Sequence, residues 1–250
     1  MSHTSPPPTD SFPTHLAHVT GDGSLHPHAV GLKFETDGQV RRFAGNTVIC
    51  PVSSRSTLMA ALVAVQDNLK TASFSSCFAF LPPSSFHMTL FEGVNDPERI
   101  AERWPTDLPL DTPLERMTEA FRDRLDGLTF QEPFRLVPTH LSCSPRGGSV
   151  LVLAGADDVA ESALRMARDE VSRRLGMTKP NHAGYRFHIT LSYQTAWLSV
   201  GQAVDLARAQ TTLVDDFRVA TPMIEIGPPV FCTFEDMTRF DPVLTLTQTR

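Results

Sequence analysis

The sequence predicts an α+β fold in which one order of elements occurs twice, and two observations lead to this prediction. A five-residue pattern is repeated, as Phe86-His87-Met88-Thr89-Leu90 and as Phe187-His188-Ile189-Thr190-Leu191, with the two histidines 101 residues apart. Each copy follows a strand-like segment and a segment of helical periodicity, so strand, helix and motif strand recur in that order. The 250 residues alone allow one large domain or two small lobes, and we see no linker between the halves. The repeated order indicates an internal pseudo-repeat at domain scale.

The first half is predicted from turn signals, apolar runs and helical periodicity. Thr36-Asp37-Gly38 is a turn signal between two short segments, Ser53, Ser54 and Ser56 are cap candidates, and Gly127 follows the last apolar position of a helix. The expected elements are a hairpin at 31–43, a strand at 47–52, a helix at 57–69, a strand at 77–81, the first motif strand and a helix at 113–125.

The second half repeats this order and adds closing elements. Its first two strands flank the turn Pro145-Arg146-Gly147-Gly148, and Gly176 stops its first helix. The expected elements are strands at 134–137 and 150–153, a helix at 159–175, the second motif strand at 185–193, a helix at 200–213, and closing strands at 223–226 and 230–234.

The extended motif carries the functional information, because the bare triplet His-x-Ser/Thr is common by chance. Nine histidines give five such triplets, and the other three begin at His3, His18 and His140. None of these three has Phe before the histidine together with Leu after the hydroxyl residue. The flanking requirement lowers the chance expectation by roughly two orders of magnitude, so the pair at His87 and His188 is significant.

Alternation along a strand predicts which side chains of the motifs share a face. The phenylalanine and leucine of each copy build core, whereas histidine and threonine face a groove. Extended along both strands, the groove-facing set is Ser85, His87, Thr89, Phe91, Arg186, His188, Thr190 and Ser192. Arg186 is a candidate contact for a phosphate or a base, and Phe91 is a candidate for stacking on a base. Each has a structural alternative, which is solvated surface for Arg186 and packing for Phe91.

This arrangement resembles the two-histidine (2H) phosphoesterase superfamily, which includes RNA 2′,3′-cyclic phosphodiesterases and bacterial RNA-ligase-like proteins. The resemblance implies two pseudo-symmetric lobes, each an antiparallel sheet with flanking helices, that face one another across a central groove. It covers about residues 45–235, with lobes at about 45–130 and 131–235 and edge elements from both termini inside one domain of residues 31–250. Residues 34–47 and 81–94 look like a microbial branch whose substrate the sequence does not reveal.

The predicted chemistry is metal-independent hydrolysis of a cyclic phosphodiester, such as the 2′,3′-cyclic phosphate of an RNA end or a small nucleotide. His87 and His188 are the catalytic candidates, one imidazole as general base and the other as general acid, and the sequence does not reveal which histidine takes which role. The hydroxyls of Thr89 and Thr190 can donate to the non-bridging oxygens. The scheme requires no cofactor. A second hypothesis is a non-catalytic binder that holds a nucleotide or phosphate in the same groove. A structural or interaction protein would leave the paired motif unexplained.

Composition excludes several other classes. The formal charge of −6 disfavours a protein that tracks long nucleic acid, although a nucleotide or an RNA end is permitted. The four cysteines form no Cys-x-x-Cys pair, and His26-Pro27-His28 lacks a partner at metal-ligand spacing. The chain also lacks the P-loop, dinucleotide, serine-hydrolase and zinc-protease motifs. The Pro-rich and Ser-rich start predicts a flexible tail at 1–30, and the absence of a signal peptide or membrane span favours a cytoplasmic location.

Overall fold

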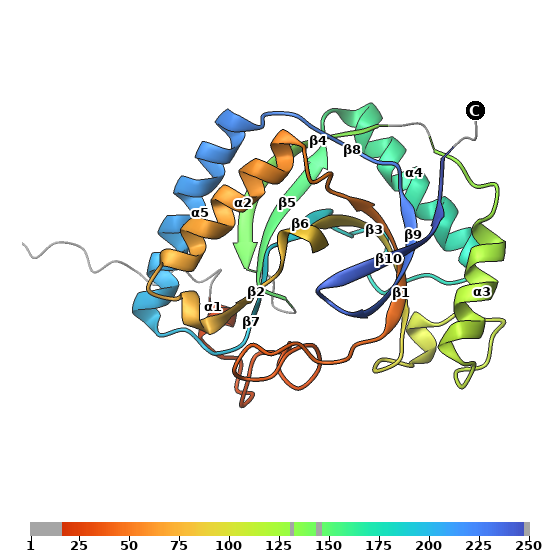
Figure 1. Cartoon of the computed structure of the whole chain (residues 1–250), viewed down its shortest axis with the longest axis horizontal. Helices are drawn as coiled ribbons and strands as arrows, with labels where there is room; N and C mark the ends of the chain where they lie inside the picture. Colours follow the sequence, from red (N-terminus) through yellow and green to blue (C-terminus); the bar gives the residue numbers. More distant parts are fainter. Residues whose placement is uncertain (1–16, 131–132, 144–146, 248–250) are drawn as a thin grey trace, which may run out of the picture.

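The structure is a computed structural model that describes residues 17–130, 133–143 and 147–247. Within these residues, eight strands form one curled antiparallel sheet and two short strands form a second sheet (Figure 1). The order across the large sheet is β10 (Arg239–Thr245), β9 (Val230–Asp236), β1 (Gly45–Pro51), β3 (His87–Asn95), β6 (His188–Thr190), β5 (Ser149–Gly155), β4 (Phe134–Cys143) and β8 (Ile224–Ile226). The small sheet pairs β2 (Phe78–Phe80) with β7 (Ser192–Gln194). The predicted α+β class is confirmed.

The helices lie outside the curled sheet in two groups (Figure 1). One group contains α2 (Thr57–Thr71) and α5 (Val200–Ala220), and α5 packs against β4. The other contains α3 (Leu114–Leu125) and α4 (Asp158–Leu175), and α4 packs against β3, β4 and β5. A single turn, α1 (Ala17–Thr20), precedes them, and 3-10 turns cover Ser75–Cys77, Pro83–Ser85 and Ala101–Arg103. No helix among the described residues is long and apolar enough to cross a membrane.

The helix ends follow the capping signals of the sequence. Ser56 is the cap of α2, where its side chain accepts a hydrogen bond from the backbone N–H of Met59. Gly176 ends α4 in the left-handed conformation, with φ of 67°. Ser199 and Gln202 form a capping box at the start of α5, which continues to Ala220, beyond the predicted end at 213.

The apolar side of each motif forms the centre of the core, as alternation predicts. The phenylalanine, aliphatic and leucine positions of both copies are at most 2% exposed, namely Phe86, Met88, Leu90, Phe187, Ile189 and Leu191. The two motif strands are neighbours, because β3 and β6 pair with Met88 opposite Ile189. The join between the halves therefore lies at the middle of one continuous sheet, and both motifs border it.

A β-bulge interrupts the regular alternation of β3. Val48 of β1 pairs with Phe91, while the next residue, Ile49, pairs with Thr89, so Leu90 is an extra residue on β3. As a result, Leu90 and Phe91 are consecutive and both are 0% exposed. After the bulge, the residues that face the core and the cavity are shifted by one position along the strand. Glu92 therefore faces the cavity, in place of Phe91.

The last strands pair across the halves. β9 and β10 follow the second half in sequence, yet β9 pairs with β1 and β10 forms the outer edge of the first half. The predicted lobe of residues 131–235 therefore differs from the observed pairing at its end. Strand β10 was not predicted, because Pro242 and its polar neighbours do not resemble a buried strand, although an edge strand tolerates them.

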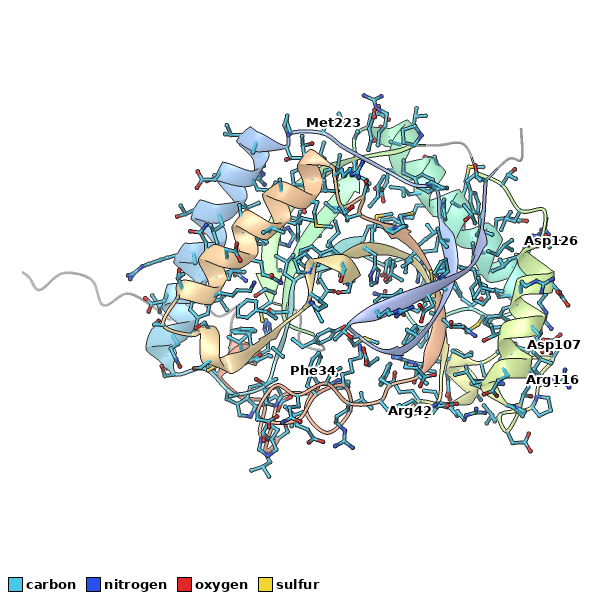
Figure 2. All side chains as sticks on the ribbon, in the orientation of Figure 1. Phe34, Arg42, Asp107, Arg116, Asp126 and Met223 are labelled. Atoms are coloured by element: carbon cyan, nitrogen blue, oxygen red, sulfur yellow. The ribbon has the colours of Figure 1, made fainter. Side chains whose placement is uncertain are left out.

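The N-terminal segment is packed over the part that the structure describes. Residues 1–16 of the predicted tail lie outside the described residues, whereas Val19 and Ala29 are at most 1% exposed and belong to the core. The carbonyl of Val19 accepts hydrogen bonds from Leu198 and Gln194, so residues 17–30 are docked and not a free tail. The predicted hairpin is present only as turns, with a bridge between Phe34 and Val40. Phe34 turns inward onto the body of the protein (Figure 2).

Candidate functional site

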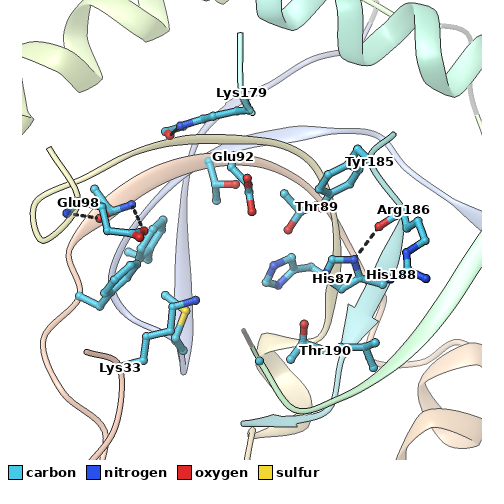
Figure 3. Close-up of a pocket in the computed structure, with 18 of the residues that line it drawn as sticks. Lys33, His87, Thr89, Glu92, Glu98, Lys179, Tyr185, Arg186, His188 and Thr190 are labelled. Carbon is cyan, nitrogen blue, oxygen red and sulfur yellow. Dashed lines mark hydrogen bonds between the residues drawn. The ribbon is translucent and has the colours of Figure 1, made fainter. Parts of the chain in front are cut away.

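Four motif side chains form a square on one face of the β3–β6 pair. Since Met88 lies opposite Ile189 in an antiparallel pair, His87 lies opposite Thr190 and Thr89 lies opposite His188. The two histidines thus occupy one diagonal of the square. Diagonal positions on neighbouring strands are about 7–8 Å apart. Figure 3 shows the two rings side by side between Thr89 and Thr190.

This square lies in the wall of a cavity of about 440 Å³. The cavity runs along the open face of β3 from His87 to Asn95, and the C-terminal hairpin contributes Phe234, Met237 and Phe240 to its wall. The ring of Phe240 meets His87 edge to face, with 4.3 Å between the ring centroids. The hairpin thus shields His87 from water, although this segment is remote from His87 in sequence.

Both imidazoles are held in the same orientation by the backbone. The Nδ1–H of His87 donates to the carbonyl of Ser85 at 2.7 Å, and the Nδ1–H of His188 donates to the carbonyl of Arg186 at 2.8 Å. A carbonyl oxygen only accepts, so Nδ1 carries the hydrogen in each ring. In the neutral state each Nε2 then presents a lone pair to a ligand.

The two histidines differ electrostatically. Burial lowers the pKa of His87 to about 4, and the charges of His188 and Lys33 add to this effect. Burial also lowers the pKa of His188, but the carboxylate of Glu92 acts in the opposite direction and raises it. Because Glu92 acts on His188 only, the two imidazoles are not equivalent.

Phe91 does not reach the cavity, so the expectation that it faces a base is wrong. The bulge at Leu90 turns Phe91 into the core, where its ring contacts the guanidinium of Arg168 at 5.1 Å. Arg168 is 1% exposed, and its Nη1 donates to the carbonyl of Leu90 at 2.6 Å. The extra residue of a bulge is left out of the regular ladder, so this hydrogen bond supports the bulged backbone. Arg168 therefore stabilises the bulge that places Glu92 on the cavity face of β3.

Ser192 and Ser85 also lie outside the cavity lining. The predicted strand of residues 185–193 is divided at Leu191, after which Ser192 joins β7 in the small sheet. Ser192 is 0% exposed, and its Oγ accepts a hydrogen bond from the backbone N–H of Ser149. Ser85 lies in the 3-10 turn before β3, where its hydroxyl donates to the carbonyl of Pro82. Both hydroxyls have structural partners.

Arg186 does line the cavity, together with its neighbour Tyr185. Arg186 is exposed at the rim of the cavity. Tyr185 is packed more deeply, and the guanidinium of Arg168 lies 3.8 Å from the centroid of its ring. The Tyr185 hydroxyl is buried beside Thr89, with no hydrogen bond of good geometry to any described residue. Burial raises the pKa of this phenol, so it remains a neutral donor.

At the end of the cavity away from the histidines, the positively charged side chains already have partners within the protein. Lys179 is 6% exposed and donates to the carbonyls of Gly93 and Arg103, and burial lowers its pKa to about 8. Arg103 forms an ion pair of 3.4 Å with Glu98. These charges hold the loop after β3 in place. Among the described residues, no group of three or more His, Cys, Asp or Glu side chains is arranged to hold a metal ion.

Comparisons with known proteins identify the family. A family model described as "2H-phosphodiest: Domain of unknown function (DUF1868)" matches residues 33–144. The crystal structure of ATU0111, a conserved protein of unknown function from Agrobacterium tumefaciens str. C58, is 33% identical in sequence. Its alignment covers 92% of this chain and 97% of that chain, with a TM-score of 0.85. The chain belongs to the 2H-phosphodiesterase family. The resemblance inferred from the paired motif is therefore confirmed, and family membership suggests a phosphodiesterase.

The protein TT0787 of Thermus thermophilus is 18% identical over 75% of this chain and 86% of that chain, with a TM-score of 0.36, which is too low to support an argument. No curated protein matches this chain.

Three cavity residues of this 2H-phosphodiesterase family member were not singled out from the sequence. Regular alternation from His87 would place Glu92 on the core face, and the only local signal of the bulge is the adjacent Gly93, a residue often found at bulges. Tyr185 was read only as the start of the motif strand. Lys33 lies in the predicted hairpin, whose position relative to the motifs follows from tertiary packing.

Proposed function

We propose that this chain hydrolyses a cyclic phosphodiester, with the 2′,3′-cyclic phosphate of a small nucleotide or an RNA end as its substrate. The observation that carries the proposal is the square of two histidines and two threonines in one cavity wall. Each imidazole is fixed through Nδ1 and presents Nε2, which suits proton transfer on opposite sides of a phosphorus atom.

His87 is the general base in this proposal. Its low pKa, about 4, keeps the ring neutral near pH 7, so Nε2 can take a proton from the attacking water. The water oxygen then bonds to phosphorus, and the proton moves to His87. The ring of Phe240 packs edge to face against the imidazole and so contributes to the burial that lowers this pKa.

His188 is the general acid. The carboxylate of Glu92 favours its protonated form, and a bound phosphate anion favours it further. As the bond between phosphorus and one ribose oxygen breaks, His188 Nε2–H donates its proton to that oxygen. The free hydroxyl and a phosphate monoester are the products. His87 then releases its proton to solvent and His188 takes one up, which restores the starting state of both rings.

Thr89 and Thr190 are the ligands of the non-bridging oxygens. Both side chains line the cavity beside the histidine of the opposite strand. A hydroxyl donor at this position stabilises the negative charge on the phosphoryl oxygens as it increases in the transition state. Arg186 at the rim suits a contact with a phosphate or a base outside the reacting group.

The experiment is turnover of the four 2′,3′-cyclic mononucleotides in excess EDTA, followed by ³¹P NMR so that the product isomer is also identified. We expect hydrolysis by the wild-type protein and none above background by a His87→Ala/His188→Ala double variant. Nucleotide binding without turnover would favour the alternative of a non-catalytic binder. Loss of turnover in EDTA with recovery on adding Zn²⁺ or Mn²⁺ would overturn the metal-independent scheme.

A further inference from the structure

The N-terminal loop brings a lysine into the cavity, and none of the contacts of this lysine neutralises its charge. The Nζ of Lys33 donates to the hydroxyl of Tyr193 at 3.3 Å and lies 4.8 Å from the centroid of the same ring. It also lies 4.9 Å from the centroid of Phe43. Among the described residues, no carboxylate forms an ion pair with Lys33. Aromatic faces attract a cation but do not cancel its charge.

The loop fixes the backbone of Lys33 from both sides. The carbonyl of Ala29 accepts the backbone N–H of Lys33 at 2.8 Å, and the carbonyl of Lys33 accepts the N–H of Arg41 at 2.8 Å. Gly31 allows the tight turn with a φ of 78°, and the buried ring of Phe34 packs on Tyr193 at 5.2 Å. The ammonium group is therefore positioned before any ligand arrives, which lowers the entropy cost of binding.

The position of this charge relative to the histidines is the second observation. Lys33 lines the same cavity as His87 and His188, and Figure 3 shows it across the cavity from Arg186. Its charge acts on both imidazoles, since it disfavours the protonated form of each. Lys33 and the two imidazoles therefore border the same cavity, where the proposed phosphate would lie.

The other cavity cations are used differently. Lys179 donates to two backbone carbonyls, Arg103 is paired with Glu98, and Arg186 is exposed at the rim. Lys33 is half-buried and faces the histidines without a compensating carboxylate. An anion is the ligand that this environment lacks.

We propose that Lys33 binds a non-bridging oxygen of the substrate phosphate and, together with Thr89 and Thr190, completes the anion site between the two histidines. This inference rests on the proposed function and extends it to a residue outside both motifs. It also gives the N-terminal turn a role, because this turn carries the ammonium group to the site.

The test uses Lys33→Met, which keeps the aliphatic stem and removes the charge, and Lys33→Arg, which keeps a cation. Lys70→Met is the matched control, because Lys70 also lies over an aromatic ring, that of Phe80, but is on α2 and pairs with Asp67. Affinity for inorganic phosphate is measured by calorimetry at constant ionic strength. We expect Lys33→Met to bind phosphate about 10- to 100-fold more weakly, the usual effect of one charge-assisted hydrogen bond. Lys33→Arg should retain most of the affinity, and Lys70→Met should match wild type.

A second readout separates a charge effect from loss of structure. NMR titration of the unliganded proteins should show the pKa values of His87 and His188 both rising in Lys33→Met, because a nearby positive charge has been removed. Equal phosphate affinity in wild type and Lys33→Met would overturn the inference. A different pair of results would overturn the proposed function alone. In that case phosphate binding depends on Lys33, but the double histidine variant still hydrolyses the cyclic nucleotide.

Discussion

His87 lies opposite Thr190, so each histidine has the threonine of the other motif as its direct neighbour. The two motifs therefore interlock at the join between the halves. This cross-pairing brings two hydroxyls and two imidazoles from two strands that are distant in sequence into one cavity wall.

Replacing either histidine by alanine should lower kcat for a 2′,3′-cyclic mononucleotide by roughly 10²- to 10⁴-fold, the usual effect of losing a positioned acid or base. The melting temperature should not fall, because His87 and His188 face the cavity. His140→Ala is the matched control, since His140 belongs to another His-x-Ser triplet but does not line the cavity. Wild-type turnover by either cavity variant would refute the assignment.

The pH dependence of kcat/KM should be a bell whose two sides report different histidines. The base must be neutral, so activity rises as pH increases through about 4, the pKa of His87. The acid must be protonated, so activity falls as pH increases through the pKa of His188, which burial places below 6.5. In kcat both limbs should lie at higher pH, because a bound phosphate anion favours the protonated rings.

Glu92→Gln should move only the alkaline limb of that profile, and move it to lower pH. Removing the carboxylate removes the influence that raises the pKa of His188, so its proton is lost at lower pH. Glu119→Gln, which removes an exposed carboxylate paired with Arg116, should leave both limbs in place. A shift of the acidic limb instead would mean that the roles of the two histidines are exchanged.

Thr89→Ser and Thr190→Ser should keep most of the activity, whereas the alanine variants should lose about 10-fold or more in kcat/KM. In the proposed mechanism the hydroxyl donates to the phosphoryl oxygen, and serine retains this hydroxyl. The comparison of serine with alanine removes the contribution of the methyl group. Equal rates for both substitutions at one position would show that this hydroxyl does not contact the reacting group.

Phe91→Leu should lower stability and leave substrate affinity unchanged. Phe91 is 0% exposed and contacts Arg168, so the smaller side chain leaves a cavity that costs about 1–3 kcal/mol of unfolding free energy. Denaturant unfolding measures this change. Phe240→Leu provides the contrast, because Phe240 touches His87 and its loss should raise the pKa of that ring by letting water approach. A large increase in KM for Phe91→Leu alone would restore the stacking hypothesis.

The sequence was sufficient for the parts of the site that lie on regular strands. His87 with Thr89, and His188 with Thr190, share the cavity face as alternation predicts. Alternation failed at Phe91 because a bulge adds Leu90, and at Ser192 because the strand changes sheets after Leu191. A bulge depends on pairing with a partner strand, and no single-strand pattern reveals it.

The contributions from outside the motifs required tertiary information. Lys33 and Phe240 come from segments near opposite ends of the chain, and both reach His87 or its surroundings only through packing. The helices were predicted well because caps such as Ser56 and Gly176 are local signals. The pairing of β9 with β1 joins distant residues, so the lobe boundary could not be predicted in the same way.

The pairing of β9 with β1 also governs when the surroundings of His87 are completed during synthesis. On the ribosome, β1 and β3 emerge early, but β1 lacks its second neighbour until Val230 and the residues after it are released. Until then, a nascent chain exposes the backbone donors and acceptors of β1 and leaves His87 open to water, because Phe240 has not yet been added. The order of translation therefore places completion of the surroundings of His87 after the release of Phe240, and a chain that stops before this residue would carry both histidines without this contact.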